Sequence, residues 1–145
     1  KSGEYQLPDA LKNMTEKGMV FVPGKVDDWM DCGNKNATVE TNSRILDYHK
    51  NDADMRASDT VVENGMIIEP CFIGKGVKIK NAIVGPHVSI GAGCNIENSI
   101  VKTSIIQENT RISNAHIENS MLGKHVDFNG KAEELSLGDY STQGL

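Results

Sequence analysis

Three histidines are the first candidates for chemistry in this chain of 145 residues, because imidazole can act as a general base or as a zinc ligand. They are His87, His116 and His125. His87 and His125 each follow an aliphatic residue by three positions, but the repeat described below places them on different sides of the fold and two turns apart. One chain is not expected to gather all three on one metal ion, and a zinc site shared between subunits stays open.

The other candidates are thiols and one loop carboxylate. The three cysteines are an odd number without a Cys-x-x-Cys pair, which favours reduced thiols over a disulfide framework. The carboxylate is Asp31, which lies just before a helix that Asn34 is expected to cap. By residue type alone, Asp31 is a surface loop residue near the start of that helix.

The element that must position the histidines is a sequence repeat between Ile67 and Phe128. Four similar segments, at spacings of 17, 16 and 16 residues, begin at Ile73, Ile90, Ile106 and Leu122. A second series begins at Ile79, Ile96 and Ile112, and a third at Ile67, Val84, Val101 and Ile117. Each period therefore holds three short units, and each unit opens on an aliphatic residue.

Units of five or six residues suit a short strand followed by a corner, and they are too short for a helix to bury a face. Three units close a triangular coil whose opening aliphatic residues form three buried columns. Asparagines that recur at one corner are expected to form a ladder in the left-handed backbone region, and they are Asn81, Asn98 and Asn114. Cys71 and Cys94 occupy small inward positions and are expected in the core.

The repeated phrase, an aliphatic residue followed by Gly, resembles the hexapeptide repeat of left-handed parallel β-helix proteins. It stands at Ile73-Gly74, Val84-Gly85, Ile90-Gly91 and Leu122-Gly123. That family includes acyltransferases, gamma-class carbonic anhydrases and C-terminal extensions of sugar nucleotidyltransferases, and the left hand of the coil is implied by the resemblance alone. Two alternatives follow: an acetyl-CoA-dependent acyltransferase with a histidine base, and a carbonic anhydrase-like zinc site. The short corners, such as Asn81 to Val84, are most similar to the nucleotidyltransferase extensions.

The first 50 residues predict a small α/β segment. Apolar spacing and Pro8 predict a helix over 7–17, and the run 19–22 predicts a strand before the turn at Pro23-Gly24. A short strand is expected to end at 29–30, and a helix to run from Asn34 to about Tyr48. The residues expected on its inner face are Ala37, Thr38, Thr41, Ile45 and Leu46.

Three motifs of this segment are similar to the closing part of sugar-phosphate nucleotidyltransferases, the group of glucose-1-phosphate thymidylyltransferases and mannose-1-phosphate guanylyltransferases. They are Gly3-Glu4-Tyr5-Gln6-Leu7-Pro8-Asp9-Ala10-Leu11, then Asp28-Trp29-Met30-Asp31-Cys32-Gly33-Asn34, then Val39-Glu40-Thr41-Asn42-Ser43-Arg44-Ile45-Leu46. Pro8 and Asn34 stand where the family usually has Thr.

The resemblance implies that Asp31 is one of two aspartates that hold Mg²⁺ against the substrate phosphates, and that Trp29 lies beside the sugar pocket. The reaction in that family joins a sugar 1-phosphate to a nucleoside triphosphate and releases pyrophosphate, and a hard cation offsets the developing charge. For Trp29, packing of the helix against the strand is an equal alternative.

The family's glycine-rich triphosphate loop has no counterpart in this sequence, because Gly74-Lys75-Gly76 and Gly91-Ala92-Gly93 are interpreted as corners of the repeat. We therefore expect a C-terminal fragment, beginning at Lys1 and not at Met, that is inactive by itself. Its expected parts are residues 1–50 as the end of a catalytic domain, 51–66 as a linker, 67–130 as the β-helix, and 131–145 as a cap and tail.

Composition limits the partners. The net charge of -5 argues against a nucleic-acid backbone, and no apolar run is long enough to span a bilayer. These features predict a cytoplasmic protein. The flat sides of the coil, with exposed aliphatic residues, predict a homo-oligomer, a dimer or a trimer.

Overall fold

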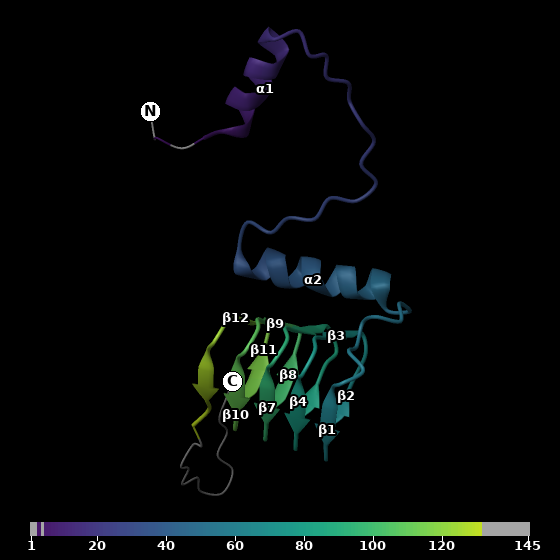
Figure 1. Ribbon diagram of the computed structural model, residues 1–145, viewed down its shortest axis with the longest axis vertical. Coiled ribbons are helices and arrows are strands. Elements are labelled where there is room, and N and C mark those ends of the chain that lie inside the picture. Colours follow the sequence, from purple (N-terminus) through teal and green to yellow (C-terminus); the bar gives the residue numbers. More distant parts are fainter. Residues whose placement is uncertain (1–2, 4, 132–145) are drawn as a thin grey trace, which may run out of the picture.

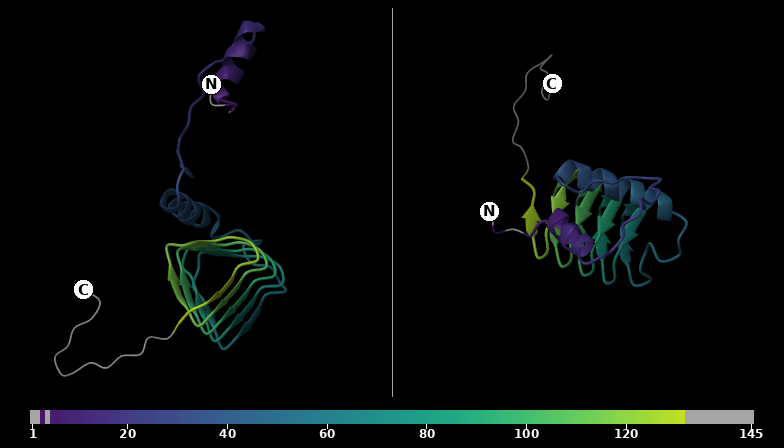
Figure 2. Two further views of the ribbon diagram at one scale, coloured as in Figure 1. Left: turned by 90° about the vertical axis from the view of Figure 1, so that its left-hand side faces the viewer. Right: turned by 90° about the horizontal axis from the view of Figure 1, so that it is seen from above.

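The repeat region forms a coil of parallel strands. The computed structural model describes residues 3 and 5–131, and this part contains two helices and 13 strands. The strands form three parallel sheets, one along each side of a triangular prism (Figure 1 and Figure 2). The fold is therefore mainly β and a parallel β-solenoid, as the repeat predicts; the left hand of the coil stays a prediction.

Each sheet takes one strand from every turn of the coil. The first has the order β1 (Val61–Glu63), β4 (Lys78–Lys80), β7 (Asn95–Glu97), β10 (Arg111–Ser113) and β13 (Asp127–Asn129). The second has the order β11 (His116–Glu118), β8 (Ile100–Lys102), β5 (Ile83–Val84) and β2 (Met66–Ile67). The third has the order β12 (Met121–Leu122), β9 (Ser104–Ile106), β6 (Val88–Ile90) and β3 (Cys71–Ile73).

The register of the strands stacks like residues on one another and so creates the core. Ile73 pairs with Ile90, Ile90 with Ile106, and Ile106 with Leu122, all within the third sheet. The other two columns hold Ile79, Ile96 and Ile112, and Val84, Val101 and Ile117, all buried. All three predicted columns are confirmed. The core is thus built from residues 16 or 17 positions apart, and each turn is stabilised by its neighbours.

The asparagine ladder is confirmed and is longer than predicted. Asn81, Asn98 and Asn114 all have positive φ angles, between 47° and 52°. Asn81 Nδ2 donates to Asn98 Oδ1 at 3.1 Å, and Asn98 Nδ2 donates to Asn114 Oδ1 at 3.3 Å. Asn64 and Asn129 extend the ladder at its two ends.

Two glycines of the repeat are required by close contact between turns. A Cβ atom on Gly74 would lie 2.7 Å from the backbone nitrogen of Ala92, and one on Gly91 would lie 2.7 Å from that of Glu108. These are corners at which successive turns approach closely, in line with the interpretation of the glycine-rich segments as parts of the coil.

The first 50 residues differ from the prediction because those that the structure describes, 3 and 5–50, contain no strand. Helix α1 (Leu7–Glu16) and helix α2 (Lys35–His49) are present, and Asn34 caps α2 by accepting a hydrogen bond of 3.0 Å from the Ala37 amide. The strands expected at 19–22 and 29–30 are wrong, because in the described part of the chain no partner strand lies beside these segments. The expected α/β segment is instead two helices joined by an extended connection (Figure 1).

Helix α2 lies over the third sheet, and its inner face is partly different from the one expected. Val39 and Leu46 are its buried residues, at 1% and 3% exposure, whereas Ile45 is 38% exposed. Val39 was not expected on this face. The face that meets the coil includes these two buried residues and Asn42, which accepts a hydrogen bond from Ser89 of β6.

The boundaries of the coil also differ in detail. β1 lies within 51–66, the segment expected to be a linker, and Ala57 already donates to the Ile73 carbonyl oxygen at 2.9 Å. The cap and tail expected at 131–145 fall almost wholly outside the described residues. Within the described residues, no helix has the length and apolar character needed to cross a bilayer.

Candidate functional site

Residues 28–32 lie antiparallel to helix α2 and are attached to it at successive turns. Asp28 lies beside Arg44 and Tyr48, Asp31 lies beside Thr41, and the Cys32 carbonyl oxygen lies 3.2 Å from Thr38 Oγ1. The chain then turns at Gly33 and enters α2 at its cap, Asn34. One helix therefore positions the whole segment that contains the expected metal ligand.

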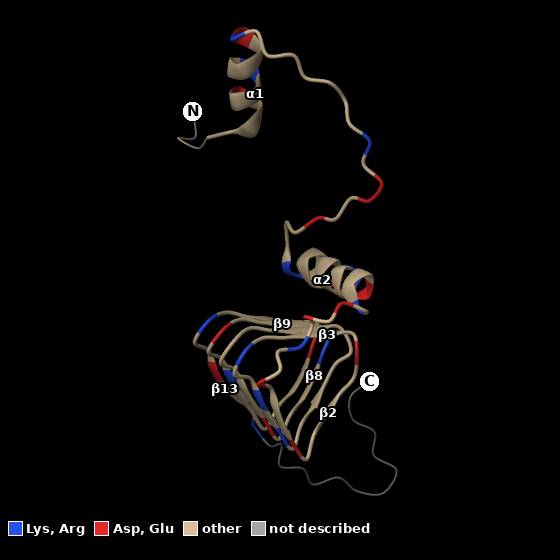
Figure 3. Cartoon of the chain, turned by 45° about the vertical axis from the view of Figure 1, so that its right-hand side comes forward, with Lys and Arg blue, Asp and Glu red and all other residues tan. Residues whose placement is uncertain are grey.

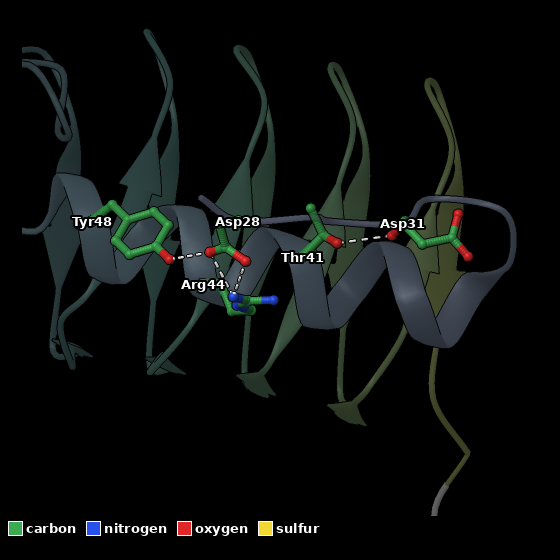
Figure 4. Close-up of polar contacts among 5 residues, drawn as sticks. All are labelled: Asp28, Asp31, Thr41, Arg44 and Tyr48. Atoms are coloured by element: carbon green, nitrogen blue, oxygen red, sulfur yellow. Dashed lines mark hydrogen bonds and ion pairs between the residues drawn. The ribbon is translucent and has the colours of Figure 1, made fainter. Parts of the chain in front are cut away.

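The strongest of these attachments is an ion pair between Asp28 and Arg44. Arg44 Nη2 lies 2.5 Å from Asp28 Oδ1 and 2.6 Å from Oδ2, and the Tyr48 hydroxyl also donates to Asp28 Oδ2 (Figure 4). The hydrogen bond from Tyr48 and the charge and hydrogen bond of Arg44 hold the pKa of Asp28 below its ordinary value of 3.8. Asp28 therefore carries a negative charge at neutral pH, and this charge is matched by Arg44.

Asp31 is held by its backbone and by one carboxylate oxygen. Its carbonyl oxygen accepts a hydrogen bond of 2.8 Å from Thr41 Oγ1, and Asp31 Oδ1 accepts one of 2.9 Å from the Gly33 amide. Asp31 is exposed, and its carboxylate points away from the other four labelled side chains (Figure 4). The backbone of Asp31 and its Oδ1 atom are thus held by hydrogen bonds, while its Oδ2 atom is accessible.

This donor set fits part of a magnesium site. Mg²⁺ prefers carboxylate oxygen ligands and usually keeps several waters, so it is bound through one or two carboxylates together with substrate phosphates. The exposed carboxylate of Asp31 would be one such ligand. Within the described residues, no three His, Cys, Asp or Glu side chains gather into a metal site.

Trp29 lies two residues before Asp31 on the same segment. Its side chain is 80% exposed, whereas Met30 next to it is half-buried. It is the single tryptophan of the chain. Packing of Trp29 between the helix and a strand, the alternative considered above, is wrong, because the strand is absent and the indole is exposed.

The three histidines lie apart in the fold. His87 Nε2 lies 3.1 Å from Asp47 Oδ1 of helix α2, and His125 is exposed at a corner. His116 pairs with Ile100 in the second sheet, and its side chain is exposed on the outer side of the coil.

Two of the cysteines lie in the core, as predicted, and the third lies at the surface. Cys71 and Cys94 are buried and Cys32 is exposed, all three as free thiols. Burial raises the pKa of the Cys71 thiol to about 11 and also raises the pKa of Cys94. Both buried thiols are therefore protonated and unreactive at neutral pH.

The sequence interpretation missed the cluster of Asp28, Arg44 and Tyr48. Arg44 and Tyr48 stand four residues apart and so share one side of α2. This spacing, together with the acidic residue next to Trp29, could have suggested that α2 binds a carboxylate. The spacing does not identify Asp28 as that carboxylate.

The fold and the site define a class of protein: a parallel β-solenoid preceded by a helix that holds a Trp-x-Asp-x-Gly loop. No family model matches the chain. The chain is 29% identical to a glucose-1-phosphate thymidylyltransferase from Streptomyces griseus and 26% identical to one from Streptomyces antibioticus, in each case over 96% of this chain and 45% of the relative. It is 37% identical to a probable mannose-1-phosphate guanyltransferase from Schizosaccharomyces pombe, over 67% of this chain and 23% of the relative.

These relatives carry the names of the family that the motifs resemble. The chain is related to the sugar-phosphate nucleotidyltransferases, and the relationship to the two Streptomyces proteins extends over its helical part and its coil. The chain spans less than half the length of these relatives.

Proposed function

We propose that this chain is the C-terminal part of a sugar-1-phosphate nucleotidyltransferase, which converts a nucleoside triphosphate and a sugar 1-phosphate into a nucleotide sugar and pyrophosphate. The observation that carries the proposal is the alignment with named thymidylyltransferases over 96% of the chain, through both the Asp31 loop and the coil. A cytoplasmic location is part of the proposal, and the three free thiols support it.

In this proposal Asp31 is a magnesium ligand and Trp29 borders the sugar site. Bound Mg²⁺ would supply charge compensation for the phosphates. The chain's own contribution is to present one carboxylate oxygen from a segment fixed on α2, while the exposed indole of Trp29 offers a flat apolar surface beside it. Because one carboxylate is an incomplete site, the 145 residues alone are expected to be inactive.

The proposal is tested by pyrophosphate release from the full-length protein with a panel of sugar 1-phosphates and nucleoside triphosphates, with and without Mg²⁺. Asp31→Asn should lower turnover at least about 100-fold, whereas the matched variant Asp27→Asn should not, because Asp27 makes only an exposed ion pair with Lys25. Full activity of Asp31→Asn would remove it from the site, and absence of pyrophosphate release with every pair would overturn the function.

We further propose that the second sheet of the coil joins subunits into a dimer or a trimer. Helix α2 covers the third sheet, and positively and negatively charged residues are interspersed along the coil (Figure 3). The second sheet has an exposed apolar column, formed by Met66, Ile83 and Ile100. Removing such a column from water favours association.

Sedimentation equilibrium tests this assembly. The double variant Ile83→Arg and Ile100→Arg should sediment as a monomer, while Lys78→Glu and Lys80→Glu on the first sheet should leave the parent mass unchanged. A monomeric parent would contradict the assembly, and an oligomeric double variant would contradict the choice of sheet.

A further inference from the structure

Residues 17–33 have no regular secondary structure, so their position depends on discrete contacts. Every residue from 19 to 27 is exposed. The first contacts with α2 along the chain are those of Asp28 with Arg44 and Tyr48. Asp31 follows only three residues later, and three residues span at most about 10 Å. Fixing Asp28 therefore restricts the region that Asp31 can reach.

The ion pair is suited to fix the position of Asp28. Arg44 Nη2 lies within hydrogen-bond distance of both carboxylate oxygens of Asp28, so a charged donor on α2 holds this carboxylate. The Tyr48 hydroxyl adds a second donor from the next turn of the same helix. The contacts at the other end of the segment do not involve a charged donor: Thr41 donates to the Asp31 carbonyl oxygen, Thr38 to that of Cys32, and the Gly33 amide to Asp31 Oδ1.

We propose that Arg44 is a positioning residue, which acts through Asp28 to hold the segment from Asp28 to Asp31 on α2 and so sets the position of Asp31. This inference rests on the proposed function, in which Asp31 binds magnesium. Residues that orient a metal ligand without contacting the metal commonly lower metal affinity 10- to 100-fold when they are removed. Arg44 is on α2, and α2 is held on the coil by the buried side chains of Val39 and Leu46, so loss of Arg44 should release the segment without releasing the helix.

The first measurement needs neither magnesium nor activity. In the 145-residue chain, Trp29 is the single tryptophan and follows Asp28 directly, so its fluorescence anisotropy reports the mobility of the segment. Arg44→Ala should lower the anisotropy, and Arg44→Lys should restore it only in part. Glu40→Gln, an exposed change on the same helix, should leave it at the parent value. In an Asp28→Ala background, Arg44→Ala should cause no further loss.

The second measurement is made in the full-length protein. Arg44→Ala should raise the Mg²⁺ concentration at half-maximal activity about 10-fold, with a smaller effect on turnover at saturating Mg²⁺. Unchanged Trp29 anisotropy and unchanged half-saturation in Arg44→Ala would overturn the inference and leave nucleotidyl transfer standing. If Asp31→Asn had normal activity while Arg44→Ala had reduced anisotropy, Asp31 would not be a magnesium ligand. Arg44 would then only attach the segment to α2.

Discussion

Ser89 Oγ donates a hydrogen bond of 2.6 Å to Asn42 Oδ1 and so joins strand β6 to the middle of helix α2. The two ends of the helix are attached as well: Lys35 Nζ donates to the Asn119 carbonyl oxygen at 2.7 Å, and Asp47 lies beside His87. Between these polar contacts lie the buried side chains of Val39 and Leu46. Helix α2 is therefore part of the body of the coil, and the Asp31 segment is attached to that body through it.

Leu46→Ala should lower the free energy of unfolding by about 2 to 4 kcal/mol, because it removes a buried side chain from the contact between α2 and the coil. Ile45→Ala is the matched control and should cost less than about 1 kcal/mol, since Ile45 is largely outside that contact. Urea unfolding followed by circular dichroism measures both. Equal losses in the two variants would contradict the position of the helix.

Ile90→Asp should abolish cooperative folding of the coil. Ile90 is 0% exposed in the middle turn, and an unpaired carboxylate there costs several kcal/mol. Val61→Asp makes a similar change at an outward position of β1 and should melt close to the parent. A thermal melt of Ile90→Asp that resembled the parent's would show that the buried columns are wrongly assigned.

Asn98→Ala should destabilise the coil by about 2 kcal/mol, and Asn98→Gly by about 1 kcal/mol. Both variants lose the hydrogen bonds to Asn81 and Asn114, but only alanine adds the cost of a side chain in the left-handed region. Chemical denaturation of the two variants separates the contributions. If Asn98→Gly lowered the free energy of unfolding as much as Asn98→Ala does, the asparagines would stabilise the coil through their hydrogen bonds alone.

The coil could be predicted from the sequence because its buried positions recur at a fixed period. Ile73, Ile90 and Ile106 identify one column without any knowledge of the other parts of the fold. The coil begins before residue 67, its predicted first residue. Its first strand begins at Val61, ahead of the glycine-containing units from which the repeat was recognised.

The helical part could be predicted only where the signal was local. Pro8 and Asn34 marked the beginnings of the two helices correctly. A strand at 19–22 would need a neighbouring strand to pair with. The apolar pattern of these four residues cannot show whether such a partner is present. The inner face of α2 depends on the surface of the third sheet, so polar Asn42 lies there instead of Ile45. The partners Asp28 and Arg44 are 16 residues apart with no periodicity between them, and only the structure brings them together.

Only one of the three thiols should react in the native protein. Cys32 is exposed, whereas burial raises the pKa of Cys71 to about 11 and raises that of Cys94, so both buried residues remain as thiols at pH 8. Titration with an aromatic disulfide reagent should therefore count one thiol before denaturation and three after it. Cys32→Ser should remove the native reaction, and a second fast-reacting thiol in that variant would contradict the burial of the core cysteines.

Acid should release the Asp31 segment only below about pH 3.8. Arg44 and Tyr48 lower the folded-state pKa of Asp28 below its ordinary value of 3.8, so the folded chain binds this proton more weakly than the unfolded chain does. The contribution of the ion pair is therefore fully present above that pH and is lost as pH falls through the lowered pKa. Trp29 anisotropy should stay constant from pH 8 to pH 4 and fall below it, while Asp28→Asn should give a low anisotropy throughout. A fall between pH 7 and pH 5 in the parent would show that another group controls the attachment.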